Sequence, residues 1–205
     1  MKTRHLLLTM LALLTSISSS AYEFETTGNG WRWTCEVLSE SEKTVSIIDM
    51  PWRHITNGSI VTTPQTVTDS STGITYSVVS LGKDSNSIYY TVFDGYDAED
   101  GAFYSLENYT IIISEGVTSI HQNTFGALEG NGKIYLPCSL TYISSGAFWC
   151  DNITIYAPLT FNLRVSSCTV KTFIPFKDET DAHVISTWAF TRIWCNGVWR
   201  YQEKA

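Results

Sequence analysis

The stretch of sequence that decides the fold is residues 134–148, which read IYLPCSLTYISSGAF. A short apolar strand runs into a proline, two apolar residues follow three positions apart, and the stretch ends on Ala147 and Phe148. A similar order stands 23 residues earlier, in residues 111–125, IIISEGVTSIHQNTF, with Ser114 in place of the proline and Thr124 in place of the alanine. A repeat of 20 to 50 residues is typical of proteins whose units stack along one axis and share a continuous core. The sequence therefore predicts stacked repeats.

The strand of this repeat recurs on both sides of the two best copies. Later copies are TIYAP at 154–158 and KTFIP at 171–175, so the strand-end position recurs at 114, 137, 158 and 175, in steps of 23, 21 and 17. Earlier, VVSL at 78–81 matches 117–120, GAF at 101–103 matches 146–148, and residues 59–64 form another strand that ends in proline. Residues 83–100 then form an insertion. Chance similarity among Thr- and Ile-rich strands is the alternative, but the shared spacing of Ile, Pro and Phe argues against it.

These repeats resemble the BspA-type leucine-rich repeat of bacterial cell-surface proteins, whose pattern is strand-I-P-x-x-V-x-x-I-x-x-x-A-F. Residues 73–82 are similar to the stretch that opens such arrays, and residues 173–175 with 188–193 resemble their C-terminal cap. The sequence departs from the pattern in the insertion, in Ser114 where the pattern has proline, and in its small number of repeats. The resemblance implies a mainly β leucine-rich-repeat solenoid with coils of about 23 residues. It also implies a secreted or surface-exposed module for adhesion, which binds host or neighbouring-cell proteins or extracellular matrix.

The N-terminal residues predict a leader and a cap. Residues 1–5 are basic, residues 6–14 are apolar but too short to span a bilayer, and Ser19-Ser20-Ala21 suits cleavage after Ala21. Residues 31–37 alternate with period two and residues 44–48 return as a second strand, so a hairpin is expected over the first repeat. The predicted organisation is a signal peptide at 1–21, capping strands at 22–58, a leucine-rich-repeat domain at 59–193 and a tail at 194–205.

Charge and cysteine content narrow the class of protein. The formal net charge of −7 becomes −9 without the leader, and no long Lys/Arg block exists, so nucleic acid and anionic membrane surfaces are not expected partners. After cleavage we expect no membrane insertion and a secreted or cell-surface location. The five cysteines match no zinc module, and no pairing follows from their spacing; they are Cys35, Cys138, Cys150, Cys168 and Cys195. Cys150 is expected to be a small buried residue.

One set of strand residues is the predicted ligand-binding site. Because strand side chains alternate between faces, the residues between the inward Ile and Leu positions point outward, and they are Ile112, Tyr135, Tyr156 and Phe173. Lys133 and Lys171 would flank this ladder two positions earlier, in register with Thr110 and Thr154. Such an aromatic stripe on a concave face suits a peptide segment or a few sugar rings. The alternative is cross-strand stacking that only stabilises the sheet.

Other residues support rival functions. Six of the seven Trp gather towards the chain ends, with Trp149 alone between them, and suit either end caps or a carbohydrate-binding module. The acidic run at 93–100 lacks the spacing of a calcium loop and suits a solvated insertion. His54, His121 and His183 are widely separated and no catalytic motif occurs, so a non-enzymatic protein is expected without metal or cofactor. A carboxylate pair of a polysaccharide-acting enzyme is the second alternative, because such pairs converge only in space.

Overall fold

The computed structural model describes residues 22–50, 57–84, 91–94, 96–97, 102–103, 108–128, 130–150, 152–158, 161, 163, 165, 169–173, 190–195 and 198–203. All regular structure within these ranges is β, as the sequence predicts, and they contain no helix. Accordingly, no helix in this part of the chain is long and apolar enough to cross a membrane. The predicted leader lies outside the described residues, as do Trp52, His54 and His183.

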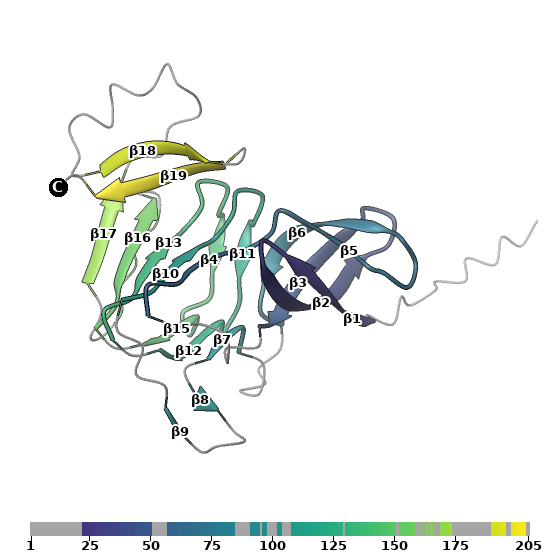
Figure 1. The fold of residues 1–205 in the computed structure, drawn as a ribbon, viewed down its shortest axis with the longest axis horizontal. Helices are drawn as coiled ribbons and strands as arrows, with labels where there is room; N and C mark the ends of the chain where they lie inside the picture. The colour runs from purple at the N-terminus through teal and green to yellow at the C-terminus, as the bar shows by residue number, and fades with distance from the viewer. Residues whose placement is uncertain are drawn as a thin grey trace, which may run out of the picture.

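A five-stranded parallel sheet collects the first strand of each repeat (Figure 1). Its order is β17 (Thr169–Phe173), β16 (Thr154–Pro158), β13 (Lys133–Tyr135), β10 (Thr110–Ile112) and β4 (Ile60–Thr62). Ile111 pairs with Ile134, which pairs with Ile155, so the register follows the 23- and 21-residue steps seen in the sequence. The strand expected at 59–64 is β4, and it pairs with β10 in parallel.

Two further sheets collect the other strands of the repeats. β11 (Ser119–Ile120) lies between β6 (Thr75–Leu81) and β14 (Tyr142–Ile143) in a seven-stranded sheet. β12 (Phe125–Leu128) lies between β7 (Phe93–Asp94) and β15 (Phe148–Cys150) in a three-stranded sheet. Along the chain, β10, β11 and β12 enter the three sheets in turn, and β13, β14 and β15 do so again in the same order. Each of these repeats therefore gives one short parallel strand to each sheet.

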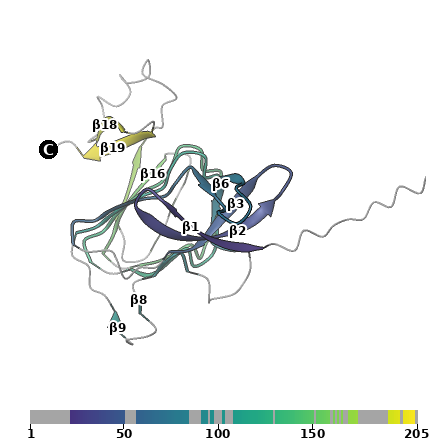
Figure 2. The same cartoon turned by 45° about the vertical axis from the view of Figure 1, so that its right-hand side comes forward.

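The N-terminal strands extend the seven-stranded sheet beyond β6. The expected hairpin is β2 (Trp31–Ser39) with β3 (Thr44–Asp49), and β3 pairs with β6 in parallel. Two strands that the sequence did not predict join them: β1 (Glu23–Gly28) pairs with β2, and β5 (Thr66–Thr68) pairs with β6. This end of the sheet is curled, so that β1 comes close to β5 (Figure 2). There the Thr26 hydroxyl on β1 donates a hydrogen bond to the Thr68 carbonyl on β5 at 3.0 Å.

The main core is one cluster of inward residues from all three sheets. Ile111, Ile134 and Ile155 are fully buried in it, as the alternation predicts. Across the three-stranded sheet, Phe93, Phe125 and Phe148 form a stack with ring centroids 5.1 and 4.7 Å apart. The indole of Trp33 meets Phe93 edge-on at 6.4 Å, so a Trp from β2 covers one end of this stack.

Two expectations about the insertion and the last repeat are wrong. Phe93 takes the place in the Phe stack that was assigned to Phe103, because β7 pairs with β12. Phe103 lies instead in β9 (Ala102–Phe103), antiparallel to β8 (Tyr96–Asp97), and this pair projects below the sheets in Figure 1. Thr169 pairs with Thr154, a step of 15 residues rather than 17. β18 (Phe190–Cys195) and β19 (Val198–Glu203) pair with each other in a separate antiparallel sheet.

Candidate functional site

The predicted aromatic ladder exists, but it is not an exposed surface. Ile112, Tyr135 and Tyr156 are register partners across β10, β13 and β16, as predicted. They form a second cluster, separate from the main core, with Cys138 packed against it. Ile112 is 9% exposed, Tyr135 8% and Tyr156 0%. The expectation that these side chains offer an open binding stripe is therefore wrong.

The last rung of the ladder also differs from the prediction. Lys171, not Phe173, pairs with Tyr156, and Phe173 pairs with Pro158. Lys133 is exposed and stands in register with Thr110 and Thr154, as predicted. Lys171 is not in register with them, because the 15-residue step moves it two positions along the strand direction. The two lysines therefore do not form one flanking row.

The side chains of the ladder stack tightly on one another. The rings of Tyr135 and Tyr156 lie 4.3 Å apart and within 6° of parallel. Parallel sheets are commonly covered on both faces, and residue alternation separates the faces without saying whether either one meets solvent. This arrangement matches the stabilising alternative weighed for the ladder.

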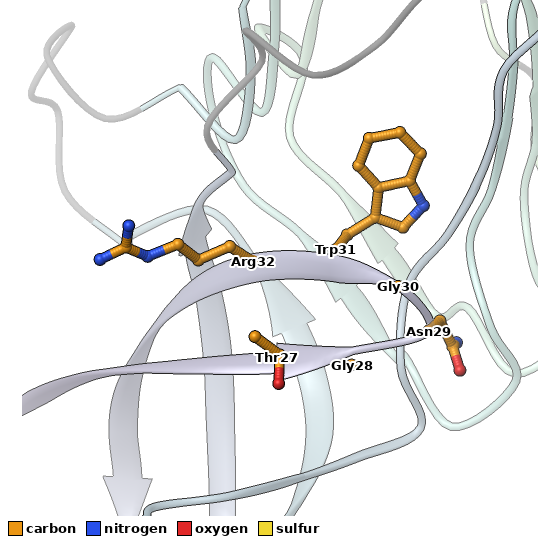
Figure 3. Close-up of a pocket in the computed structure, with 6 residues that line it drawn as sticks. All are labelled: Thr27, Gly28, Asn29, Gly30, Trp31 and Arg32. Atoms are coloured by element: carbon orange, nitrogen blue, oxygen red, sulfur yellow. The ribbon is translucent and has the colours of Figure 1, made fainter.

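The Trp residues of β2 differ in their surroundings. Trp33 is fully buried, and its indole N–H donates to the Gly28 carbonyl at 2.9 Å. Trp31 lies beside the β1–β2 turn, where a shallow pocket is lined by Thr27, Gly28, Asn29, Gly30, Trp31 and Arg32 (Figure 3). Trp31 is partly buried and packs against the main core, whereas its strand neighbour Arg32 is exposed and shares the opposite face with its register partner Thr27. The lining groups thus do not converge on one ligand position.

The polar groups of this pocket also have structural partners. The Asn29 amide donates to the carbonyls of Thr62 and Thr63 at 3.3 and 3.2 Å, and Arg32 forms an ion pair with Glu25. Asn29 and Gly30 have positive φ angles of 53° and 83°, the conformation that a tight hairpin turn requires. The pocket is therefore best explained as the outer surface of the β1–β2 turn. Through Asn29 this turn is hydrogen-bonded to the end of β4 and the residue after it.

The most exposed aromatic side chain in the described residues is Trp149, at 73%. It lies on β15, between the inward residues Phe148 and Cys150, and its register partner on β12 is Gly126. A Cβ at Gly126 would come within 2.6 Å of the Thr91 methyl group and 3.2 Å of its hydroxyl. Thr91 therefore occupies the space beside Trp149 where a side chain at position 126 would stand.

A second exposed aromatic lies on the preceding strand of the same repeat. Tyr142 on β14 is 51% exposed, and its ring centroid lies 5.9 Å from that of His121. The Gln122 side chain packs over Gly146, in the turn between β14 and β15. Trp149 and Tyr142 thus stand on different sheets of one repeat. The sequence assigns no role to either residue, because Tyr142 is an unspecified position of the repeat pattern and Trp149 lies just beyond its end.

Three groups with shifted pKa values lie in or beside the N-terminal strands, and their contacts are structural: Cys35, Asp69 and Tyr76. Asp69 accepts hydrogen bonds from the Ser71 backbone N–H and hydroxyl and from the Thr72 and Tyr22 hydroxyls, which lower its pKa, the Ser71 hydroxyl most. The Tyr22 and Tyr76 hydroxyls lie 2.7 Å apart, and burial raises the pKa of Tyr76. Burial also raises the pKa of the Cys35 thiol to about 12, which leaves it protonated at neutral pH.

Side chains that could bind a metal ion do not gather in the described part of the chain. The described residues hold no group of three His, Cys, Asp or Glu side chains with that capacity. Most of the acidic run at 93–100 lies outside those whose side chains the structure describes. Cys150 is buried, as expected, although it pairs with Leu128 rather than Ala127 because a bulge shifts the register.

Comparison with known proteins gives no match. No family model matches the sequence, and neither a curated protein nor a solved structure is significantly similar to it.

Proposed function

We propose that this chain is a secreted or surface-exposed binding module built as a leucine-rich-repeat solenoid. The observation that carries the proposal is the register. Residues 23 apart pair in all three sheets, as Ile111 with Ile134, Ile120 with Ile143, and Phe125 with Phe148. A chain that enters the same three sheets in the same order at a fixed period is what coils of a solenoid require.

The ends of the repeat array support the same proposal. A solenoid must cover the apolar ends of its core. Trp33 on β2 closes the Phe stack on Phe93, and the Asn29 amide covers carbonyls beside β4. Towards the other end, Phe161, Leu163 and Val165 pack against the main core at alternate positions. The N-terminal strands fit the role of a cap, and the predicted leader fits an extracellular location.

Binding rather than catalysis is proposed because the repeats supply a rigid scaffold and surface aromatics. The aromatic ladder, which the sequence predicts as the site for a peptide segment or a few sugar rings, is buried at Ile112, Tyr135 and Tyr156. The ligand class therefore depends on the aromatic residues that remain exposed, and Trp149 specifically favours the carbohydrate alternative.

The test is direct binding of the purified protein to immobilised extracellular matrix proteins and to a glycan array. We expect saturable binding to at least one member with a Kd of about 100 µM or tighter. Absence of binding to every member would overturn the proposal. Release of reducing sugar from any polysaccharide in the array would replace it with the enzyme alternative.

A further inference from the structure

The outward side of β15 carries an aromatic platform that the fold does not use. Trp149 is 73% exposed, so its indole adds little to the core, whereas the residues on either side of it point inward. The other large exposed apolar side chains of the described residues are Leu38, Ile60 and Tyr142, each on a different strand from Trp149. Trp149 therefore stands apart from them.

A threonine fills the space beside Trp149 on the neighbouring strand. Gly126, the register partner of Trp149, has the Thr91 side chain folded over its outward side. Neighbouring strands lie about 4.8 Å apart, so the Thr91 side chain lies about one strand spacing from the Trp149 position. An exposed flat apolar ring with a hydroxyl-bearing side chain on the next strand suits a sugar ring, which presents C–H groups on its face and hydroxyls around its rim.

The small apolar area of this surface argues against a protein partner, and the negative charge of the chain argues against an acidic ligand. A stable protein interface buries about 800 Å² on each side around an apolar centre, whereas one Trp supplies at most about 250 Å². The chain carries a net charge of −7, which repels acidic ligands and leaves the binding of a neutral ligand unaffected. We infer that Trp149, with Thr91 beside it, is the binding site for a neutral oligosaccharide or polysaccharide chain. This inference rests on the proposed function as a binding module.

The experiment is isothermal titration of the full purified protein with cellohexaose, chitohexaose, mannohexaose and laminarihexaose. At least one of the four should bind, and Trp149→Ala should weaken that binding more than tenfold. The matched control is Tyr142→Ala, which removes an exposed aromatic from a different sheet and should change the Kd less than twofold. Both variants should unfold at the wild-type temperature, because both side chains are largely exposed.

The outcomes separate this inference from the proposed function. If no hexasaccharide binds, or if Trp149→Ala binds as well as the wild type, the Trp149 site is wrong. If a matrix protein binds in that case, the binding-module proposal stands without the sugar site. If neither class of ligand binds, both proposals fail.

Discussion

Single residues explain where this chain keeps and where it leaves its repeat pattern. Ser114 stands at the position of Pro137 in the next repeat, and it is buried. Its backbone N–H donates to the Thr63 hydroxyl at 2.8 Å, and its own hydroxyl donates to the Thr63 carbonyl. A proline has no N–H and could make neither bond. The serine therefore links the end of β10 to the end of β4, its neighbour in the sheet.

Gly132 is required by the size of a side chain in the preceding repeat. The residues just before β10, β13 and β16 are Tyr109, Gly132 and Ile153, all buried. A Cβ at Gly132 would lie 2.6 Å from Cε2 of the Tyr109 ring, which is enclosed and cannot swing away. We predict that Gly132→Ala destabilises the protein by about 1–3 kcal/mol in urea denaturation.

A double-mutant cycle provides the control for Gly132. In a Tyr109→Ala background the ring is gone, and the further change Gly132→Ala should cost less than about 0.5 kcal/mol. An equal cost in both backgrounds would mean that backbone conformation, and not the Tyr109 ring, requires the glycine.

Asp69 should make stability depend on pH in the acid range. Its pKa is lowered in the folded protein, first of all by the Ser71 hydroxyl. Its contribution is therefore complete above the unfolded pKa of about 3.9 and disappears as pH falls through the lower folded value. Denaturant titrations of wild type and Asp69→Asn between pH 2 and 6 should show a stability difference that narrows below about pH 4. A difference that stays constant over this range would contradict the assignment.

At the level of the strands, aromatic side chains at equivalent positions stack on one another and hold neighbouring repeats together. One stack lies on the inward face of the three-stranded sheet and the other on the opposite face of the five-stranded sheet from the main core. Phe93, Phe125 and Phe148 stack inside the main core, and Tyr135 stacks on Tyr156 in the second cluster. Parallel strands in register place equivalent side chains directly beside one another, so one residue choice repeated along the chain gives a continuous stack.

The buried Tyr stack predicts that replacing Tyr156 destabilises the protein, whereas an exposed ladder would predict little effect on stability. Tyr156 is fully buried, so Tyr156→Ser should cost about 3 kcal/mol or more through the cavity and the lost stacking. Tyr142→Ser, on an exposed Tyr, should cost less than about 1 kcal/mol. Thermal and urea unfolding of both variants measure the difference. Similar small costs would show that Tyr156 meets solvent.

For the whole molecule, we predict that one complete 23-residue repeat can be deleted without loss of the fold. Deleting residues 115–137 joins Ser114 to Cys138 and removes 23 residues. β14 and β15 would then take the places of β11 and β12 beside β6 and β7, and β10 would meet β16. We predict a shortened protein with a cooperative transition, an unchanged type of far-UV circular dichroism spectrum and a lower Tm.

The control for this deletion is one that breaks the period. Removing residues 115–131 instead joins non-equivalent positions, so the remaining strands cannot pair in register. This variant should not fold cooperatively. Folding of both deletions, or of neither, would contradict the proposed solenoid.

Sequence pattern alone assigns the strands of the two best repeats, their 23-residue period and the side of each strand that faces the main core. These properties are local or repeated. Alternation marks the inward Ile and Phe residues and a 23-residue shift aligns them, so Ile134, Ile143 and Phe148 are assigned by the sequence pattern alone. The hairpin of β2 and β3 followed in the same way from period two and a turn.

Contacts between distant segments determine which surfaces meet solvent and which residues of the irregular repeats pair with their neighbours. Tyr156 is an outward residue by alternation, yet it is fully buried, whereas Trp149, which the repeat pattern leaves unassigned, is 73% exposed. Phe93 rather than Phe103 continues the Phe stack, and Lys171 rather than Phe173 pairs with Tyr156. Alternation fixes the face on which a side chain lies, but burial depends on segments distant in sequence, and register across a shortened repeat depends on pairing with the neighbouring strand.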